Sequence, residues 1–296
     1  MKNLDLSLVV ISDVDGCLLD GHTYSSDAAS EALDVLREHD VPLVLCSSKT
    51  SGELEALQQR LGLEWPFICE NGGAIYVPAG YLPFEIPGSV CRNGYEVLTL
   101  GGAYQNVVSA VRRAARETSV DLLLFADMNA SEIADDTGLS ADEAVMAKQR
   151  EHDEPFRLKT SDSAARERFE QRLAASGVRV VRGGRYDHAV INADKGRASV
   201  ILRHVFRKAY GPLTTLGLGD ALNDVPLLRS VDLPVVVRSS SEEATREVHE
   251  MVPWAQVTDA VGPLGWQAAV LKVVAGRVQI WEGCDGAQGC GHTKAS

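Results

Sequence analysis

The chain has 296 residues and a formal net charge of −12 at pH 7, which argues against nucleic acid or an anionic membrane surface as its main partner. A hydrophobic content of 45% is typical of a globular protein, and the length favours two compact units over one. No apolar stretch approaches the roughly 20 residues that a membrane-spanning helix needs. Six scattered cysteines and the lack of a signal-peptide pattern at the start predict a reducing, cytoplasmic environment.

The first predicted strand spans residues 7–12 and ends at Asp13-Val14-Asp15-Gly16. Side chains on a strand repeat every two residues, so the two carboxylates point the same way. Like charges held together need a cation between them, and Mg²⁺ prefers oxygen ligands. Gly16 allows the chain to turn away and leaves the carboxylates at an open end of the sheet. The pattern therefore indicates a metal site, while an acidic turn is the alternative that these residues alone leave open.

Alternating strands and helices follow the acidic pair, in the pattern of a parallel sheet covered on both faces. Thr50 and Glu53 form a capping box, which predicts that a helix begins at residue 51. The elements expected in this part of the chain are helices at 27–39 and 51–61 and strands at 42–47, 67–69 and 74–77.

The end of the strand at 42–47 carries a second group of polar residues, Ser47, Ser48 and Lys49. A hydroxyl and backbone amides near the start of the next helix are suited to holding phosphate oxygens, because helix N-termini attract anions. An ordinary strand-to-helix turn has the same composition. These residues therefore become informative only when other parts of a phosphate site follow.

From about Tyr81, prolines and glycines interrupt the pattern and a different set of elements begins. We expect residues 82–188 to form a separate α/β cap domain, inserted into a discontinuous core domain of residues 1–81 and 189–276. A cleft would lie between them, where ligands commonly bind. Residues 277–296 are expected to form a flexible tail. The elements expected in the insert are strands at 95–99, 121–125, near 156, 178–181 and 189–191, and helices at 104–118, after the Ser140 and Glu143 capping box, and at 164–176.

After the insert the alternating pattern resumes, and Lys195 stands at the head of a predicted helix at 196–210. This end of a helix dipole is unfavourable for a cation, so an anionic partner is expected, with a solvated surface lysine as the alternative. The further elements expected are a strand at 214–218, a helix from 225, a strand at 233–237 and helices at 242–249 and 264–274.

The strand at 214–218 is followed by a fourth polar segment, which contains Asp220, Asn223 and Asp224. A carboxylate at a strand end, with a second carboxylate four residues later, is typical of a metal ligand and the residues that support it. Each of the later segments is weak alone. Their joint presence in this order, each beside a predicted core element, favours a phosphoryl-transfer site.

The four segments together resemble the haloacid dehalogenase superfamily of phosphatases. The resemblance is carried by the motifs at 13–16 and 219–224 and extends over the chain up to its last residues, from about 277. It implies an α/β fold with a Rossmann-like core built on a parallel sheet and an inserted α/β cap. It also implies Mg²⁺ as the cofactor and a covalent aspartyl-phosphate route. Cys17 stands where the family usually has threonine.

The same resemblance implies a role for each matching residue. Asp13 would attack phosphorus, and Asp15 would protonate the leaving oxygen and then deprotonate the hydrolytic water. Asp224 would either reach the metal through water or position Lys195. The remaining roles are phosphate binding by Ser47, Ser48 and Lys195, binding of Mg²⁺ by Asp13, Asp15 and Asp220, and support of that metal site by Asn223 and Asp224.

The insert makes the chain similar to the branch whose α/β caps cover sugar phosphates, and within it to the phosphatases of mannosyl-3-phosphoglycerate. This substrate, a small sugar phosphate, carries a carboxylate beside its phosphate, so a selective cap needs fixed cations. The candidates are Arg150, Arg182 and Arg185, with Lys49 from the core side. The segments that carry this resemblance are 20–25, 45–50, 66–72, 148–151, 154–156 and 182–186.

Three alternatives stay open at this point. In the first, the substrate is glucosyl-3-phosphoglycerate or another sugar phosphate. This alternative is open because His152 and Asp153 depart from the aromatic residue and serine expected there. In the second, the enzyme is a phosphotransferase such as a phosphomutase, which passes the phosphate to a sugar hydroxyl instead of to water. A non-catalytic sugar-phosphate sensor would need a broken site, which the sequence does not show. No oligomeric state is indicated, and His22, Tyr24 and His188 are further candidates for ligand contact.

Overall fold

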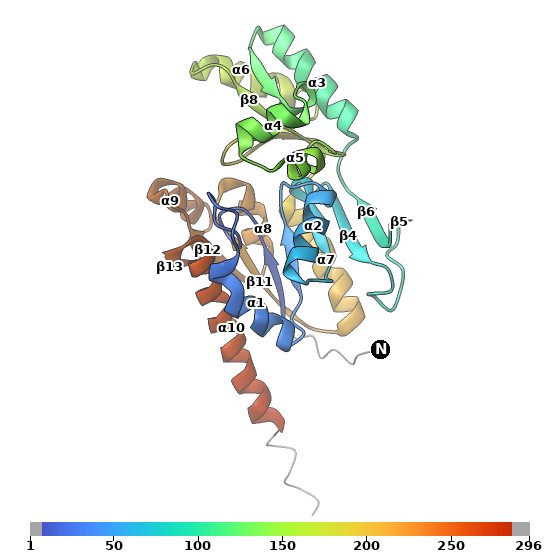
Figure 1. Cartoon of the computed structure of the whole chain (residues 1–296), viewed down its shortest axis with the longest axis vertical. Helices are drawn as coiled ribbons and strands as arrows, with labels where there is room; N and C mark the ends of the chain where they lie inside the picture. The colour runs from blue at the N-terminus through green and yellow to red at the C-terminus, as the bar shows by residue number, and fades with distance from the viewer. Residues whose placement is uncertain (1–7, 286–296) are drawn as a thin grey trace, which may run out of the picture.

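The computed structural model describes residues 8–285, and within that range the strands form two sheets (Figure 1). The strands on one side of the large sheet are parallel, and the last three at the other edge are antiparallel. Its spatial order is β13 (Gln256–Val261), β12 (Leu233–Arg238), β11 (Thr214–Gly219), β1 (Leu8–Ser12), β2 (Leu43–Cys46), β3 (Phe67–Cys69), β4 (Ala74–Pro78), β6 (Tyr95–Thr99) and β5 (Val90–Arg92).

Helices cover both faces of the large sheet. On one face lie α1 (Ser30–Glu38), α2 (Ser51–Leu61) and α10 (Gly262–Asp285), and on the other α7 (Lys195–Tyr210) and α8 (Val225–Ser230). Leu8 and Val10 of β1 are buried in the first apolar cluster, and Val9 and Ile11 in the second. A strand that is apolar on both faces is what a doubly covered parallel sheet requires. A further helix, α9 (Glu242–Met251), packs beside β12.

Residues 104–190, here called the insert, form the antiparallel small sheet. Two helices pack on one of its faces, and two shorter ones lie on the side that Figure 1 shows nearer to the large sheet. The strands are, in spatial order, β7 (Leu122–Leu124), β8 (Asp153–Leu158), β10 (Asp187–Val190) and β9 (Arg179–Arg182), and the helices are α3 (Tyr104–Thr118), α6 (Ser163–Ala174), α4 (Ala130–Thr137) and α5 (Ala141–Ala147).

The insert contacts the large-sheet unit through α5. The hydroxyl of Thr50, just before α2, donates a hydrogen bond to the carbonyl oxygen of Met146 at 3.1 Å. A Cβ atom at Gly52 in α2 would lie 3.8 Å from the Met146 side chain, so the two helices pack closely here. Figure 1 shows α5 directly above α2.

The strand expected at 95–99 is present as β6, but it lies in the large sheet and not in the insert. It pairs with β4, where Val97 is in register with Tyr76. The edge of β4 would otherwise present unpaired backbone groups, which β6 satisfies. The expectation that residues from 82 onward leave the core is therefore wrong for 90–99. Among the α-helices and strands, β5, α4 and β13 are present without having been expected.

The last helix differs in length from the expectation. It was expected at 264–274, but α10 spans Gly262–Asp285, so residues 277–285 of the expected tail are helical. The rest of that tail, 286–296, lies outside the described residues. In the part of the chain that the structure describes, no helix has the length and apolar character needed to cross a membrane.

Candidate active site

Three parallel strands bring predicted site residues to one edge of the large sheet. β1 lies between β2 and β11 and runs parallel to both. Asp13 follows β1, Ser47 follows β2, and Asp220 follows β11. Because parallel strands end at the same edge of a sheet, the side chains after them share one region.

Lys195 is buried at the first position of α7 and contacts two carboxylates. Its Nζ donates to Oδ1 of Asp13 at 2.5 Å and to Oδ1 of Asp224 at 2.6 Å. The side chain of Asp194 caps the helix by accepting the N–H of Arg197 at 2.8 Å. The expected anionic partner of Lys195 is present, and the alternative of a solvated lysine is excluded because the residue is only 2% exposed.

Asp224 joins Lys195 to the loop that carries Asp220. While its Oδ1 accepts from Lys195, its Oδ2 accepts the N–H groups of Asp220 and Ala221, each at 3.1 Å. A Cβ atom at Gly219 would lie 2.3 Å from Cβ of Asp224, so only glycine allows this close approach. Of the two alternatives for Asp224, contact with Lys195 is the one observed.

The carboxylates at this edge carry more negative charge than Lys195 balances. Burial and the charge of Asp224 raise the pKa of Asp13 to about 7, although Lys195 acts in the opposite direction. Burial, Asp13 and Asp224 raise the pKa of Asp220 well above its usual range. Crowded carboxylates with raised pKa values are those that a further cation would stabilise in their charged form.

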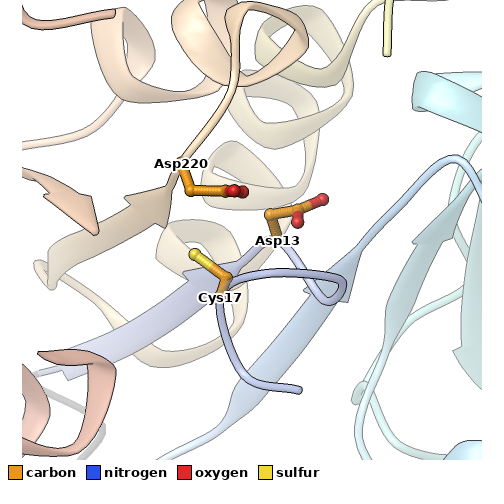
Figure 2. A group of neighbouring side chains, drawn as sticks. All are labelled: Asp13, Cys17 and Asp220. Atoms are coloured by element: carbon orange, nitrogen blue, oxygen red, sulfur yellow. The ribbon is translucent and has the colours of Figure 1, made fainter. Parts of the chain in front are cut away.

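Several atoms here are available to such a cation. Among the described residues, Oδ1 of Asp15 and Oδ1 of Asn223 are buried without a hydrogen-bond partner. Asp13, Cys17 and Asp220 are neighbours (Figure 2), and one ligand atom of each lies within 4.8 Å of the others. Carboxylate and amide oxygens are the ligands that Mg²⁺ prefers. The donor set therefore fits a divalent cation.

The segment after β2 carries a buried hydroxyl and a partly buried lysine. Oγ of Ser47 accepts the N–H of Lys49 at 3.2 Å, and Nζ of Lys49 lies 3.1 Å from Oδ2 of Asp15. Burial alone would lower the pKa of Lys49, but Asp15 and Glu53 raise it above its usual range, so the amine stays charged. The predicted capping box of Thr50 and Glu53 at the start of α2 is confirmed.

A cavity of about 620 Å³ lies between this edge of the large sheet and the insert. Its volume is within the range of small-molecule sites, about 300–1,000 Å³. Ser47 and Lys195 are buried and do not line it. Lining residues outside the predicted site include Ser239, Ser240 and Gly262, near β12 and β13. Of the predicted site residues, Asp13, Asp15, Ser48, Lys49, Arg150, Arg185, Asp220 and Asn223 line the cavity, as do His22, Tyr24 and His188.

The guanidinium of Arg150 borders the cavity but is occupied by protein groups. Its Nη2 pairs with Oδ1 of Asp153 at 2.8 Å and donates to the carbonyl oxygen of Ser48 at 2.5 Å. Its Nη1 donates to the carbonyl oxygen of Ala147 at 3.3 Å. These bonds tie the insert to the segment after β2, and they leave Arg150 little capacity for the expected substrate contact.

The other two cap arginines differ from each other. Arg182 lies between Glu170 at 2.6 Å and Asp187 at 3.0 Å and does not line the cavity, so its position does not support substrate contact. Arg185 lines the cavity and donates one hydrogen bond from Nη1 to the carbonyl oxygen of Thr137. Its planar guanidinium keeps further donors beyond this bond.

Asp153, which departs from the expected serine or aromatic residue as does His152, is buried and contacts several side chains. It pairs with Arg150, accepts from Nδ2 of Asn71 at 2.7 Å, and has Nδ1 of His188 2.9 Å from its Oδ2. Burial acts to raise its pKa, but Arg150 and His188 outweigh this and lower it to about 2. Because His188 lines the cavity, Asp153 orients a side chain that faces the site.

Glu70 was not assigned a role from the sequence, yet it fastens the insert to the large-sheet unit. Its carboxylate accepts the backbone N–H groups of Glu151 at 3.0 Å, His152 at 2.7 Å and Asp153 at 2.9 Å. Glu70 and the next residue have φ values of 48° and 56°. In the sequence, the Asn-Gly pair after Glu70 indicates this turn, because asparagine and glycine favour left-handed backbone conformations.

Comparisons with known proteins agree with this geometry. A family model described as haloacid dehalogenase-like hydrolase matches residues 10–87. A glucosyl-3-phosphoglycerate/mannosyl-3-phosphoglycerate phosphatase of Methanococcoides burtonii is 35% identical over 266 residues, which cover 90% of this chain and 97% of that protein. The chain is a phosphatase of the haloacid dehalogenase-like hydrolase family. The alternative of a non-catalytic sensor is thereby excluded.

A second relative, from Persephonella marina, has the same name as the Methanococcoides burtonii protein. It is 33% identical, over 94% of this chain and 100% of its own length. Among solved structures, a subclass IIB sugar phosphatase of the superfamily superposes with a TM-score of 0.60 at 16% identity, covering 91% of this chain and 99% of its own. The predicted α/β fold with an inserted unit is confirmed, and membership of the family implies a divalent metal.

Proposed function

We propose that this phosphatase hydrolyses the phosphate ester of a glycosyl-3-phosphoglycerate, with the mannosyl ester as first candidate and the glucosyl ester as second. Two relatives that share about a third of their residues with it carry both substrates in their names. The observation that carries the proposal is that Asp13 and Arg185 line one cavity from opposite units. A phosphate at Asp13 and a carboxylate near Arg185 would match the two anionic groups of this substrate.

In the proposed reaction Asp13 is the nucleophile. Its carboxylate oxygen bonds to phosphorus while the ester oxygen leaves and takes a proton from Asp15. A water molecule then gives a proton to Asp15 and attacks phosphorus, which breaks the bond between phosphorus and the Asp13 oxygen. Inorganic phosphate leaves, and both side chains return to their starting states.

The phosphate oxygens would be held from two sides in this proposal. Lys195 contacts Asp13 at 2.5 Å, so its charge would stay beside the reacting carboxylate through both steps. Ser47 and Ser48 would donate to the transferred group, and Lys49, paired with Asp15, would keep that side chain oriented. The two lysines are placed before the substrate arrives, because their contacts with carboxylates already hold them.

The metal in this proposal is Mg²⁺, bound by the carboxylates of Asp13 and Asp220 and by the backbone carbonyl of Asp15. When bound, it would supply a fixed positive charge for the oxygens of the phosphate group. Asn223 would orient the site, and Asp224 would hold the Asp220 loop through its two backbone contacts. We further propose that the insert acts as the cap domain that selects the ester.

A phosphate-release assay with mannosyl-, glucosyl- and unglycosylated 3-phosphoglycerate tests this proposal. We expect release from the glycosylated esters with the highest kcat/KM, and none from the Asp13→Asn variant. Release from Asp13→Asn at the wild-type rate would overturn the covalent route. An isomerised sugar phosphate in place of free phosphate would establish the phosphotransferase alternative.

A further inference from the structure

Cys17 lies in a tight loop after β1 and has no part in the proposed reaction. The loop is closed by two backbone hydrogen bonds, from the N–H of Leu19 to Val14 at 2.8 Å and from the N–H of Gly16 to Leu19 at 2.9 Å. The Cys17 side chain is fully buried, with 0% relative exposure. The loop therefore fixes the direction of the thiol.

The thiol lies close to two carboxylates that line the cavity. Sγ of Cys17 and one carboxylate oxygen each of Asp13 and Asp220 lie within 4.8 Å of one another (Figure 2). The other described cysteines, Cys46, Cys69 and Cys91, do not belong to this group. This group of side chains thus combines two hard oxygen ligands with one soft sulfur ligand, although Cys17 itself does not line the cavity.

Divalent cations are expected to bind this donor set with different affinities. Mg²⁺ takes oxygen ligands and makes no use of a thiol, whereas Zn²⁺ and Co²⁺ bind thiolate as well as carboxylate. Three protein ligands with one open position are typical of zinc sites that also hold a small molecule. With threonine in place of Cys17, the pocket would lack the ligand that distinguishes these metals.

We propose that Cys17 makes this pocket a binding site for thiophilic divalent cations, with Zn²⁺ held by the Cys17 thiolate and the carboxylates of Asp13 and Asp220. On binding, the metal–sulfur bond replaces the S–H bond, and the proton goes to solvent. The inference rests on the proposed function, because both place a divalent cation beside Asp13. Zn²⁺ held there occupies the nucleophile and competes with Mg²⁺ as an inhibitor.

The test uses the full-length, metal-free protein with Cys91, Cys284 and Cys290 replaced by serine, so that thiols elsewhere do not give the same signal. Co²⁺ is added, and the near-ultraviolet sulfur-to-cobalt charge-transfer band is recorded. We expect the band in this protein and its loss when Cys17→Thr is added. We expect the Zn²⁺ affinity, measured by competition with a chromophoric chelator, to be about tenfold or more lower in Cys17→Thr.

A second measurement keeps the inference testable should Cys17→Thr fail to fold. The ¹¹³Cd chemical shift of the Cd²⁺ complex of the same serine background separates sulfur ligation from all-oxygen ligation without changing Cys17. A shift typical of oxygen ligands alone, or a cobalt band that persists in folded Cys17→Thr, would overturn the inference.

The two proposals fail in different ways. Phosphate release by the wild-type enzyme with Mg²⁺ tests the proposed function and does not depend on sulfur. Release with Mg²⁺ but no sulfur band refutes only the role of Cys17. A sulfur band without phosphate release from any glycosyl-3-phosphoglycerate refutes only the proposed substrate.

Discussion

Nη2 of Arg150, in the insert, donates to the backbone carbonyl oxygen of Ser48 in the segment after β2, over 2.5 Å. The same guanidinium is paired with the fully buried Asp153. The insert therefore contacts the proposed phosphate-binding segment through a hydrogen bond from an arginine that a buried carboxylate holds in place. This relationship gives Arg150 a structural task that Arg185, with one backbone partner, does not share.

The first prediction concerns Arg150→Ala. The change leaves the Asp153 carboxylate buried without its main cation, which costs about 3–5 kcal/mol in comparable pairs. We expect a lower free energy of unfolding in urea and a lower kcat on both an aryl phosphate and the glycosyl ester, since the Ser48 segment loses its support. A KM effect confined to the glycosyl ester, with stability unchanged, would contradict this assignment.

Arg182→Ala is the matched control for that experiment. Arg182 also forms two ion pairs in the insert, but its side chain is 38% exposed. Exposed pairs contribute at most about 1 kcal/mol. We expect its unfolding free energy and its kinetic constants to stay near those of the wild type.

For Arg185→Ala we predict a change in substrate selection. Arg185 lines the cavity from the insert, so its loss should raise KM for the glycosyl ester by about tenfold or more, equivalent to one charge-assisted hydrogen bond of at least about 1.4 kcal/mol. Turnover of a simple aryl phosphate should be unaffected, because that ester has no second anionic group. Equal losses on both substrates would refute the role.

Lys195→Gln should impair the chemical step. Removal of the lysine that contacts both Asp13 and Asp224 leaves these carboxylates without a cation at that position. We expect kcat to fall by about 10²–10³, as in the loss of comparable electrostatic groups. Lys208→Gln, on the same helix, is the control. A fall of less than tenfold would show that Lys195 is not needed for charge balance.

Stability of the metal-free protein should decrease as the pH rises from about 4 to about 7. The pKa of Asp13 is raised from 3.8 to about 7, so in this window the folded chain holds a proton that the unfolded chain has lost. The unfolding free energy then falls with pH, because the folded state binds more protons. Urea titrations in EDTA at several pH values measure this slope, and Asp13→Asn should reduce it.

Mg²⁺ provides the counterpart of that experiment. A cation that neutralises Asp13 and Asp220 should stabilise the protein more at neutral pH than near pH 5, because protonated carboxylates bind it poorly. Equal stabilisation at both pH values would show that these carboxylates do not bind the metal.

The position of the candidate site was predictable because its signals are local. Asp13 and Asp220 each follow an apolar strand, and the ends of neighbouring parallel strands meet at one edge. The capping box of Thr50 and Glu53 involves residues three apart, so it was equally visible in the sequence. The roles of these residues in catalysis stay predictions.

Long-range pairing was not predictable in the same way. The pattern at 95–99 describes a strand but does not say which sheet it joins, and that choice depends on the free edge of β4. The hydrogen-bond partners of Arg150 were not predictable from the sequence either. Ser48 is 102 positions away, and an arginine in a segment rich in both charges gives no sign that it is buried.

Glu70 gives the insert a fixed point that is separate from the two places where the chain crosses between the units. The hydrogen bonds from Arg150 to Ser48 and from Thr50 to Met146 hold the insert as well. Asp187 is in register with Phe156, three residues along β8 from the residue that Glu70 holds, or about 10 Å. The turn at 183–186, which borders the cavity, leads into this paired strand, so the contacts of Glu70 help to set the position of the turn relative to Asp13.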